Sequence, residues 1–309
     1  MLLVFPGQGS QKVGMGKDIY DAFQCARDVF HEVNDSISFN LSDVIFNGTE
    51  EQLKSTENTQ PGLMAVSIAF LKVMQIERGI DLVDAAKYLS GHSLGEYTAL
   101  CAAGVLSLSD TAKILRTRGK LMSEAFPIGG AMAAILGLGV DIITQIVSDV
   151  NKKEGMVQLA NDNAEGQVVV SGLKSSIESV MKFANSAGAK KTVLLEVSGP
   201  FHSELMEKAA VFLSDYLRDI NFADPRKPII SNVTAEAENG NFKKLLLEQI
   251  IKPVRWRESM LFAAKNEVST CVEIGSGKVL TGLGKRISPE INNITINSFE
   301  SAMEFALEL

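Results

Sequence analysis

Short apolar segments alternate with longer segments of helical periodicity along most of the chain. Residues 2–5 predict a buried strand, and residues 18–33 and 61–78 predict helices. Later apolar runs at 228–231 and 271–274 predict further strands of the same sheet. Because strands that alternate with helices are typical of a parallel sheet with helices on its faces, the pattern predicts an α/β fold.

The order of predicted strands and helices changes after a break at Pro127-Ile128-Gly129-Gly130. The pattern there predicts the order β-α-β-β-α-β, with strands at 131–136, 156–160, 167–171 and 191–197 and helices at 142–151 and 175–187. This order is the split βαβ arrangement of a ferredoxin-like unit. We therefore expect residues 128–198 to form a small domain inserted into a hydrolase-like α/β domain made of residues 1–127 and 199–309, with Ser198-Gly199-Pro200 as the return hinge.

Composition and charge limit the classes of partner. The 309 residues carry a net charge of −7, which argues against nucleic acid as the main partner because binding to phosphates needs clustered Lys and Arg. The three cysteines, Cys25, Cys101 and Cys271, are far apart and show neither metal nor disulfide spacing. With no signal peptide or apolar run long enough to span a membrane, the chain is expected to be cytoplasmic, with no membrane and no metal.

Gly91-His92-Ser93-Leu94-Gly95 fits the G-x-S-x-G pattern of a nucleophile elbow. An apolar segment at 85–89 predicts a strand before it, and small apolar residues at 95–103 predict a helix after it. In that context Ser93 is predicted to be a nucleophile, with the N–H groups of the helix N-terminus facing developing negative charge. The alternative is a tight strand–helix connection with a buried serine.

A serine hydroxyl needs a general base, and the chain contains three histidines. His31 lies in an early amphipathic helix, and His92 is adjacent to Ser93, so both are interpreted as structural residues. His202 follows the hinge and is the predicted base, with a helix cap as the alternative role. No acidic residue is clearly placed to orient it. Glu96 and Asp224 are conceivable, and a backbone or amide carbonyl could serve instead.

The Gly-rich segment Gly7-Gln8-Gly9-Ser10-Gln11 follows the first predicted strand. Its glycine spacing fits neither a dinucleotide-binding fingerprint nor a phosphate-binding loop. The segment is therefore either an ordinary turn or a loop near the elbow that offers N–H groups to an oxyanion.

Several motifs occur together, in one order, over nearly the whole chain. They are Pro6-Gly7-Gln8-Gly9-Ser10-Gln11, Gly91-His92-Ser93-Leu94-Gly95-Glu96-Tyr97, Arg118-Gly119, Gly199-Pro200-Phe201-His202-Ser203, Gln249 with Pro253-Val254-Arg255-Trp256, and Glu273-Ile274-Gly275-Ser276-Gly277-Lys278. With this set the chain resembles the malonyl-CoA:acyl carrier protein transacylases of bacterial type II fatty acid synthesis. The resemblance implies a hydrolase-like α/β domain with a ferredoxin-like insert, in agreement with the hydrophobic pattern.

The resemblance also implies roles for single residues. Ser93 would be the nucleophile and His202 the base, oriented by a main-chain carbonyl near Gln249 rather than by an acid. Gln11 and the N–H of Leu94 would form the oxyanion hole. From its neighbours alone, Arg118 would be read as part of a solvated helix face over residues 109–125. The resemblance makes it the partner of the malonyl carboxylate, which a guanidinium binds through two parallel hydrogen bonds.

The resemblance implies malonyl-CoA and acyl carrier protein as partners, no cofactor, and malonyl transfer through a covalent serine ester. Phe201 matches a position where a bulky ring would exclude an α-methyl branch. We expect a monomer. Three alternatives stay open: a serine esterase or thioesterase, a transacylase that serves a polyketide pathway in trans, and a carrier-protein-binding scaffold with an inactive site.

Overall fold

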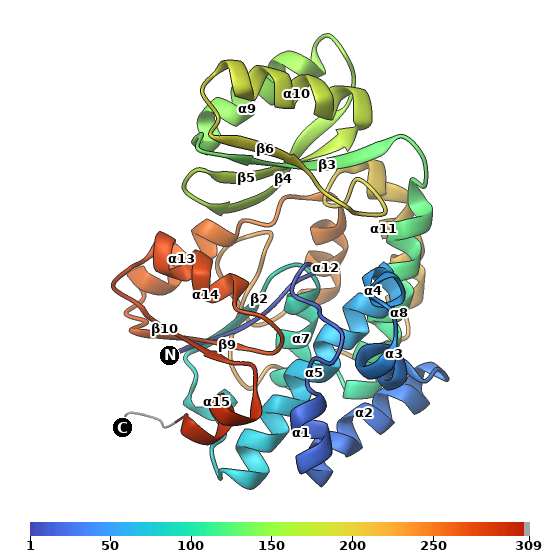
Figure 1. Cartoon of the computed structure of the whole chain (residues 1–309), viewed down its shortest axis with the longest axis vertical. Helices are drawn as coiled ribbons and strands as arrows, with labels where there is room; N and C mark the ends of the chain where they lie inside the picture. Colours follow the sequence, from blue (N-terminus) through green and yellow to red (C-terminus); the bar gives the residue numbers. More distant parts are fainter. Residues whose placement is uncertain (306–309) are drawn as a thin grey trace.

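The computed structural model describes residues 1–305, which form two separate sheets with helices packed around them (Figure 1). The larger sheet has six strands in the order β10-β9-β1-β2-β7-β8. All neighbours in it pair in parallel except β7 and β8. Its strands are β1 (Leu2–Phe5), β2 (Tyr88–Gly91), β7 (Ile229–Ile230), β8 (Ala237–Glu238), β9 (Thr270–Ile274) and β10 (Asn292–Ile296).

Strand β1 at the centre of this sheet shows why the strands read as continuous apolar runs. Leu3 and Phe5 point into the main hydrophobic core, whereas Leu2 and Val4 point into a second core on the opposite face. All four side chains are buried because helices cover both faces, as is usual for parallel sheets.

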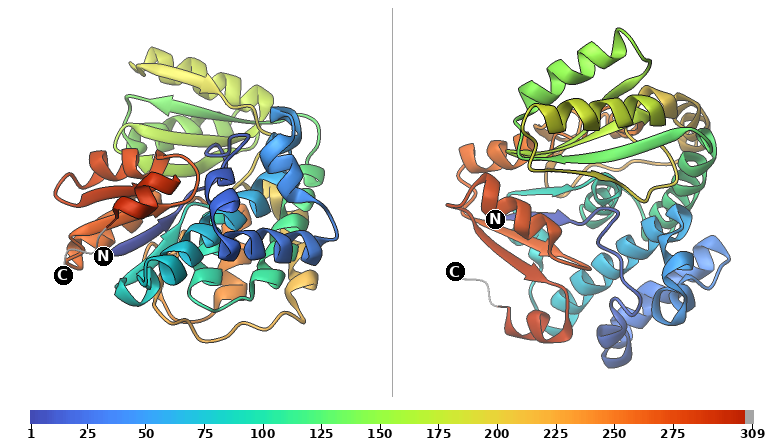
Figure 2. Two further views of the ribbon diagram at one scale, coloured as in Figure 1. Left: turned by 60° about the horizontal axis from the view of Figure 1, so that its bottom comes forward. Right: turned by 45° about the horizontal axis from the view of Figure 1, so that its top comes forward.

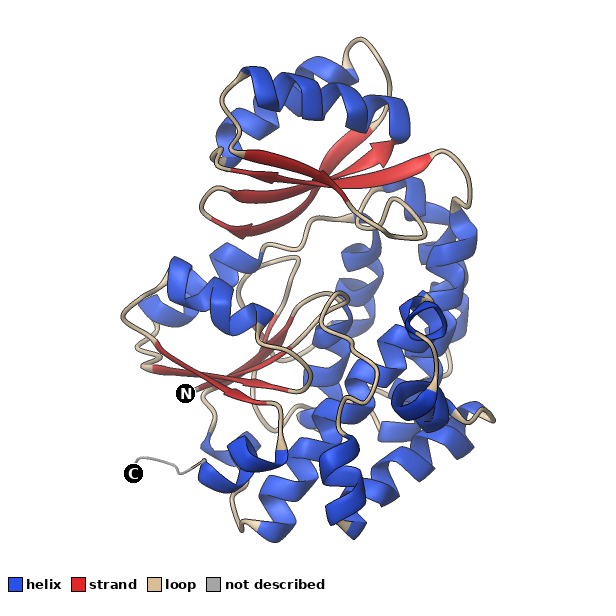
Figure 3. Ribbon diagram, viewed as in Figure 1, coloured by secondary structure: helices blue, strands red, loops and turns tan. Residues whose placement is uncertain are grey.

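Helices surround the larger sheet in all three views (Figures 2 and 3). Those before the smaller sheet are α1 (Lys17–Ala22), α2 (Gln24–Ile37), α3 (Leu41–Asn47), α4 (Glu50–Lys54), α5 (Thr56–Glu77), α6 (Leu82–Ala85), α7 (Leu94–Ala102) and α8 (Leu108–Ala125). Those after it are the 3-10 turn η1 (Glu204–Met206), α11 (Glu207–Leu217), α12 (Phe242–Ile251), α13 (Trp256–Lys265), α14 (Val279–Ile287) and α15 (Phe299–Glu304).

The smaller sheet is antiparallel, has the order β4-β5-β3-β6, and lies above the larger one in Figure 1. Its elements are β3 (Gly130–Leu136), α9 (Val140–Asn151), β4 (Val157–Ala164), β5 (Gln167–Leu173), α10 (Lys174–Ser186) and β6 (Lys191–Leu194). Both helices pack on one face of this sheet around a hydrophobic core of their own. The predicted fold, a largely parallel α/β core with a ferredoxin-like unit, is therefore confirmed.

Two predicted helices differ from the observed ones. The helix predicted at 18–33 is divided at Phe23, which has extended backbone and stacks on Phe299 with 5.7 Å between ring centroids. Helix α5 begins at Thr56, ahead of Pro61, because buried polar residues continue the helix upstream of the apolar run.

No helix within residues 1–305 is both long enough and apolar enough to cross a membrane.

Candidate active site

Ser93 lies between strand β2 and helix α7, at the carboxyl edge of the larger sheet. Its φ of 54° and ψ of −107° are unusual for a residue with a side chain, and such strain is expected at a nucleophile elbow. The helix begins at Leu94, so the Leu94 N–H has no acceptor within the helix. The Ser93 hydroxyl therefore lies beside a backbone N–H that has no hydrogen-bond acceptor within residues 1–305.

The two glycines of the motif are explained by close backbone packing. A Cβ on Gly91 would collide with the backbone of Gly95 and Glu96, and a Cβ on Gly95 would collide with the carbonyl of Phe5. The turn therefore fits against strand β1 only because both positions lack a side chain.

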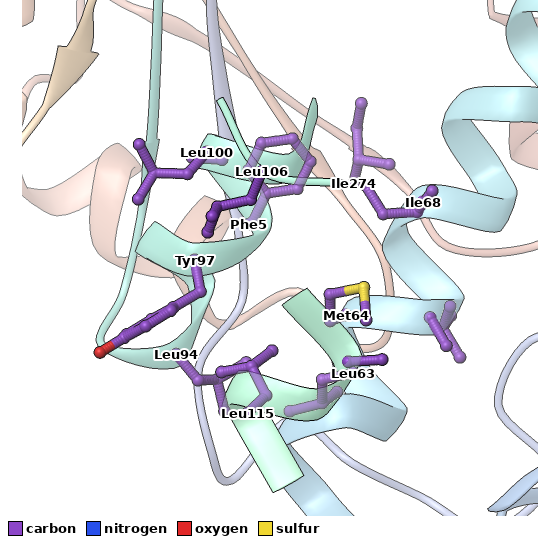
Figure 4. Packing of buried hydrophobic residues seen from close by; sticks show 14 of the residues in the cluster. Phe5, Leu63, Met64, Ile68, Leu94, Tyr97, Leu100, Leu106, Leu115 and Ile274 are labelled. Atoms are coloured by element: carbon purple, nitrogen blue, oxygen red, sulfur yellow. The ribbon is translucent and has the colours of Figure 1, made fainter. Parts of the chain in front are cut away.

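Large buried side chains fix the first turns of α7 in the main hydrophobic core. Leu94, Tyr97 and Leu100 of this helix belong to the main core, and Leu94 lies beside Leu115 of α8 (Figure 4). Tight packing of this kind supports the strained conformation at Ser93.

Of the three histidines, His202 is the one that lies within hydrogen-bond distance of Ser93 Oγ. Its Nε2 lies 2.8 Å from Ser93 Oγ, and its Nδ1 lies 2.7 Å from the backbone carbonyl of Gln249. Because that carbonyl only accepts hydrogen bonds, Nδ1 carries the proton and Nε2 is left to accept one from the serine. His202 also has a positive φ of 55°.

Burial keeps this imidazole neutral. His202 is 4% exposed. Loss of hydration, followed by the nearby positive charge of Arg118, lowers the pKa of His202 to about 3. The imidazole is therefore free to act as a proton acceptor in its resting state.

Arg118 of α8 reaches the serine from the other side. Its Nη2 lies 3.1 Å from Ser93 Oγ and 2.9 Å from the side-chain oxygen of Gln249, and its Nη1 lies 2.7 Å from Gln60 Oε1. The guanidinium is 1% exposed and stands over the ring of Tyr97 at 5.1 Å. Among residues 1–305 its Nε has no hydrogen-bond partner, and no carboxylate forms an ion pair with it.

The side chain of Gln249 connects the elbow to a buried acid. Its Nε2 donates to the Ser93 carbonyl at 3.0 Å and to Glu96 Oε2 at 2.7 Å. Loss of hydration raises the pKa of Glu96 to about 7. Glu96 is held by Gln249 and by the Asn232 N–H, and the hydrogen-bond partner of His202 Nδ1 is the Gln249 carbonyl.

Asn232, in the loop after strand β7, supports the same turn. Its Oδ1 accepts from the Ser93 N–H at 2.8 Å, and its Nδ2 donates to the Gly91 carbonyl at 2.8 Å. The sequence interpretation missed Asn232. It follows a strand that lies beside β2 in parallel, and the carboxyl edge of such a sheet is where site residues gather.

A cavity of about 110 Å³ lies over the serine. Leu94, Arg118 and Phe201 line it, as do Gln8 and Gln60. Gln11 is not among the lining residues, and its side chain accepts a hydrogen bond from the Gly9 N–H at 2.7 Å. The loop after β1 thus reaches the cavity through Gln8, and no local sequence signal distinguishes this glutamine from Gln11.

Neither His92 nor Asp224 takes part in the hydrogen bonds that join Ser93, His202 and Gln249, although His92 lines the cavity. His92 Nε2 lies 2.8 Å from Asn163 Oδ1, and burial lowers the pKa of His92. Asp224 is exposed, and the His202 Nδ1 that it would have oriented is paired with the Gln249 carbonyl instead. Within the part of the chain that the structure describes, no cluster of three or more His, Cys, Asp or Glu side chains is placed to hold a metal ion.

Comparison with known proteins gives one consistent result. A profile of the acyl transferase domain matches residues 2–295. The malonyl CoA-acyl carrier protein transacylase of Bacillus subtilis (strain 168) is 43% identical over 308 residues, which cover 99% of this chain and 95% of that protein.

Solved structures agree with the sequence comparison. The acyl-carrier-protein-S-malonyltransferase of Bartonella henselae has a TM-score of 0.95 and 46% identity, and covers 98% of this chain and 96% of its own. A malonyl-transacylase solved in complex with its type II PKS acyl-carrier protein has a TM-score of 0.93 and 39% identity, with 98% of this chain and 97% of that one covered.

Proposed function

This chain belongs to the acyl transferase family, among the malonyl-CoA:acyl carrier protein transacylases, and on that basis we propose that Ser93 and His202 carry malonyl transfer in two steps. The observation that supports this most directly is the buried guanidinium of Arg118, 3.1 Å from the serine oxygen and without a carboxylate partner in residues 1–305. A buried cation in that place fits a substrate that brings its own negative charge.

In the first step His202 Nε2 takes the proton of Ser93 as Oγ attacks the thioester carbonyl of malonyl-CoA. The negative charge that forms on the carbonyl oxygen is stabilised by the Leu94 N–H. We assign the second donor to Gln8 rather than to Gln11, since Gln8 lines the cavity. The C–S bond then breaks, His202 returns the proton to the sulfur, and coenzyme A leaves.

In the second step the phosphopantetheine thiol of acyl carrier protein gives its proton to His202 and attacks the malonyl-serine ester. The ester C–O bond breaks, Ser93 takes the proton back from His202, and malonyl leaves on the carrier. Two half-reactions through one acyl-enzyme predict ping-pong kinetics. No step uses a cofactor.

Arg118 would hold the malonyl carboxylate during both steps. In the free site its Nη1 and Nη2 donate to the neutral oxygens of Gln60 and Gln249, so the arginine is positioned without being neutralised. A bidentate carboxylate would add the missing negative charge. Phe201 lines the same cavity and would restrict a branch at the α-carbon.

Radiolabelled malonyl-CoA tests this function. Without carrier protein, label should accumulate on Ser93, and mass mapping of the digest should locate it there. With the phosphopantetheinylated carrier, label should move to the carrier. Label that appears only as free malonate would show a thioesterase instead, which would have little use for Arg118. Comparing carriers of fatty acid and polyketide synthesis would separate the two pathways, a question raised by the polyketide relative.

We also propose that residues 128–198 are an inserted domain within 1–127 and 199–309. The separate sheet and the separate hydrophobic core of the insert support this division. Native-state hydrogen exchange should then show the two cores opening with different free energies. A monomer in the cytoplasm stays a prediction, which gel filtration and cell fractionation would test.

A further inference from the structure

The loop that carries His202 is hydrogen-bonded to a residue of the smaller sheet that has no part in the mechanism above. His202 lies after the return from the smaller sheet and just before the turn η1, and its backbone has a positive φ. Such a conformation persists only where the surrounding structure determines it. The Gln249 carbonyl that orients the imidazole lies on a different element, near the end of α12. Something must therefore keep these two segments at a fixed separation.

Gln158 of strand β4 contacts both segments. Its side-chain oxygen accepts from the Glu204 N–H at 3.0 Å, and its Nε2 donates to the His202 carbonyl at 3.3 Å. The same Nε2 donates to the carbonyl of Ile251 at 3.0 Å, two residues beyond Gln249. One amide thus uses both of its ends to connect the backbone of the base with the backbone of the group that orients the base.

The strand that carries this amide is itself fixed to the larger domain. The backbone of β4 exchanges hydrogen bonds with Val254, through Ala160 O at 2.8 Å and Asp162 N at 3.0 Å. Asp162 also forms an ion pair with Arg257 of α13. Gln158 therefore reaches the base loop from a rigid support, although it belongs to the smaller sheet (Figure 1).

We propose that Gln158 is a positioning residue for the acylation of Ser93, which holds the His202 loop and the end of α12 at the separation that the imidazole–carbonyl hydrogen bond requires. The proposal rests on the proposed role of His202 as base. Gln158 does not line the cavity over the serine, so it acts through His202 rather than on the substrate.

Loss of this amide should have two effects that a general loss of stability would not produce. The base would be misplaced, and a displacement on the order of 1 Å can cost about 10²-fold in rate. The loosened imidazole would also become more hydrated, so its pKa would rise toward its ordinary value. The groups that face it, Arg118 on α8 and His92 in the elbow, would remain in place, as would Glu96, which reaches it through Gln249.

The experiment compares Gln158→Leu, Gln158→Glu and Asn151→Ala with the parent enzyme. The Leu variant loses all three contacts, whereas the Glu variant loses both Nε2 donors and keeps the acceptor for Glu204 N–H. Asn151→Ala is the matched control: its side-chain amide makes two hydrogen bonds of 2.7 Å to Val157, next to Gln158, and does not touch the base loop. Single-turnover loading of Ser93 from malonyl-CoA is followed against pH, together with KM and the melting temperature.

We expect Gln158→Leu to load Ser93 about 10- to 100-fold more slowly with KM changed less than about twofold. The midpoint of the acid limb in its pH profile of Ser93 loading should rise to between about pH 5 and 6.5. Gln158→Glu should show a smaller shift in the same direction. Asn151→Ala should load like the parent enzyme at a comparable melting temperature. The proposal is overturned if Gln158→Leu and Asn151→Ala behave alike, if the change is confined to KM, or if the acid limb does not move. Failure of the parent enzyme itself to load Ser93 would instead refute the proposed function.

Discussion

The Nδ1 of His202 lies 2.7 Å from the backbone carbonyl of Gln249, which stands where the acid of a serine triad would accept from the histidine. A carbonyl fixes the tautomer of the imidazole as a carboxylate would, but it carries no full negative charge. An imidazolium formed at this position is therefore stabilised less, and the adjacent Arg118 destabilises it further. The site should depend on a base that is neutral over an unusually wide range of pH.

The first prediction concerns the pH dependence of acylation. Because burial and Arg118 lower the pKa of His202 to about 3, kcat/KM for malonyl-CoA should not fall through protonation of the base between about pH 8 and 5. The measurement is kcat/KM across that range in buffers of constant ionic strength. An acid limb centred near the ordinary histidine value of about 6.5 would contradict the assignment. Any inflection near pH 7 should be absent in Glu96→Gln, since Glu96 titrates there.

The second prediction concerns the nucleophile. Ser93→Ala removes the only atom able to form the ester in the proposed mechanism, so no malonyl adduct should appear, and kcat should fall by about 10⁴-fold or more. Intact-protein mass spectrometry after incubation with malonyl-CoA checks the first point, and a carrier-loading assay checks the second. Thr98→Ala is a suitable control because this buried hydroxyl lies in α7, the helix that follows Ser93, and does not line the cavity. Full transfer by Ser93→Ala would refute the covalent mechanism.

The third prediction concerns the acyl group. Arg118→Ala should lower kcat/KM for malonyl-CoA by about 10²-fold or more, because a buried charge pair that loses one partner costs about 2–5 kcal/mol. Transfer from acetyl-CoA, which has no carboxylate, should fall much less, so the preference for malonyl should be lost. Arg118→Lys should restore part of the rate, since it keeps the charge without the bidentate fork. Unchanged selectivity in the Ala variant would remove Arg118 from the carboxylate site.

Much of this arrangement follows from local sequence, and the remainder depends on contacts between distant segments. The glycines around Ser93 and the periodicity of the insert are local signals, which is why the elbow and both sheets could be predicted. Other features depend on how loops from different elements meet in the fold. These are the position of Gln8 in the cavity lining, the hydrogen bonds of Asn232 to the elbow, and the contacts of Gln158 with the His202 loop. Nothing in the spacing of residues distinguishes Gln8 from Gln11, because their difference is the direction in which one turn presents its side chains.

The last prediction concerns stability and comes from Glu96. Loss of hydration raises its pKa in the folded protein to about 7, from an ordinary value of 4.5 in the unfolded chain. Between these two values the folded state binds more protons than the unfolded state, so the contribution of Glu96 to the free energy of unfolding falls as pH rises. His202 contributes with the opposite sign below about pH 6.5, because its pKa is lowered on folding.

Glu96→Gln keeps the size of the side chain and an oxygen for the Gln249 amide, but it removes the titration. The histidine contribution remains in both proteins, so it cancels in the difference between them. The variant should gain stability relative to the parent enzyme as pH rises from about 4.5 to 7, by at most about 1.4 kcal/mol per pH unit. Urea unfolding at several pH values measures this difference. Glu258→Gln is the control, since the pKa of Glu258 is lowered by Arg255 and it should not titrate in this window. If Glu96→Gln runs parallel to the parent enzyme as the control does, Glu96 is ionised throughout the range and its raised pKa is wrong.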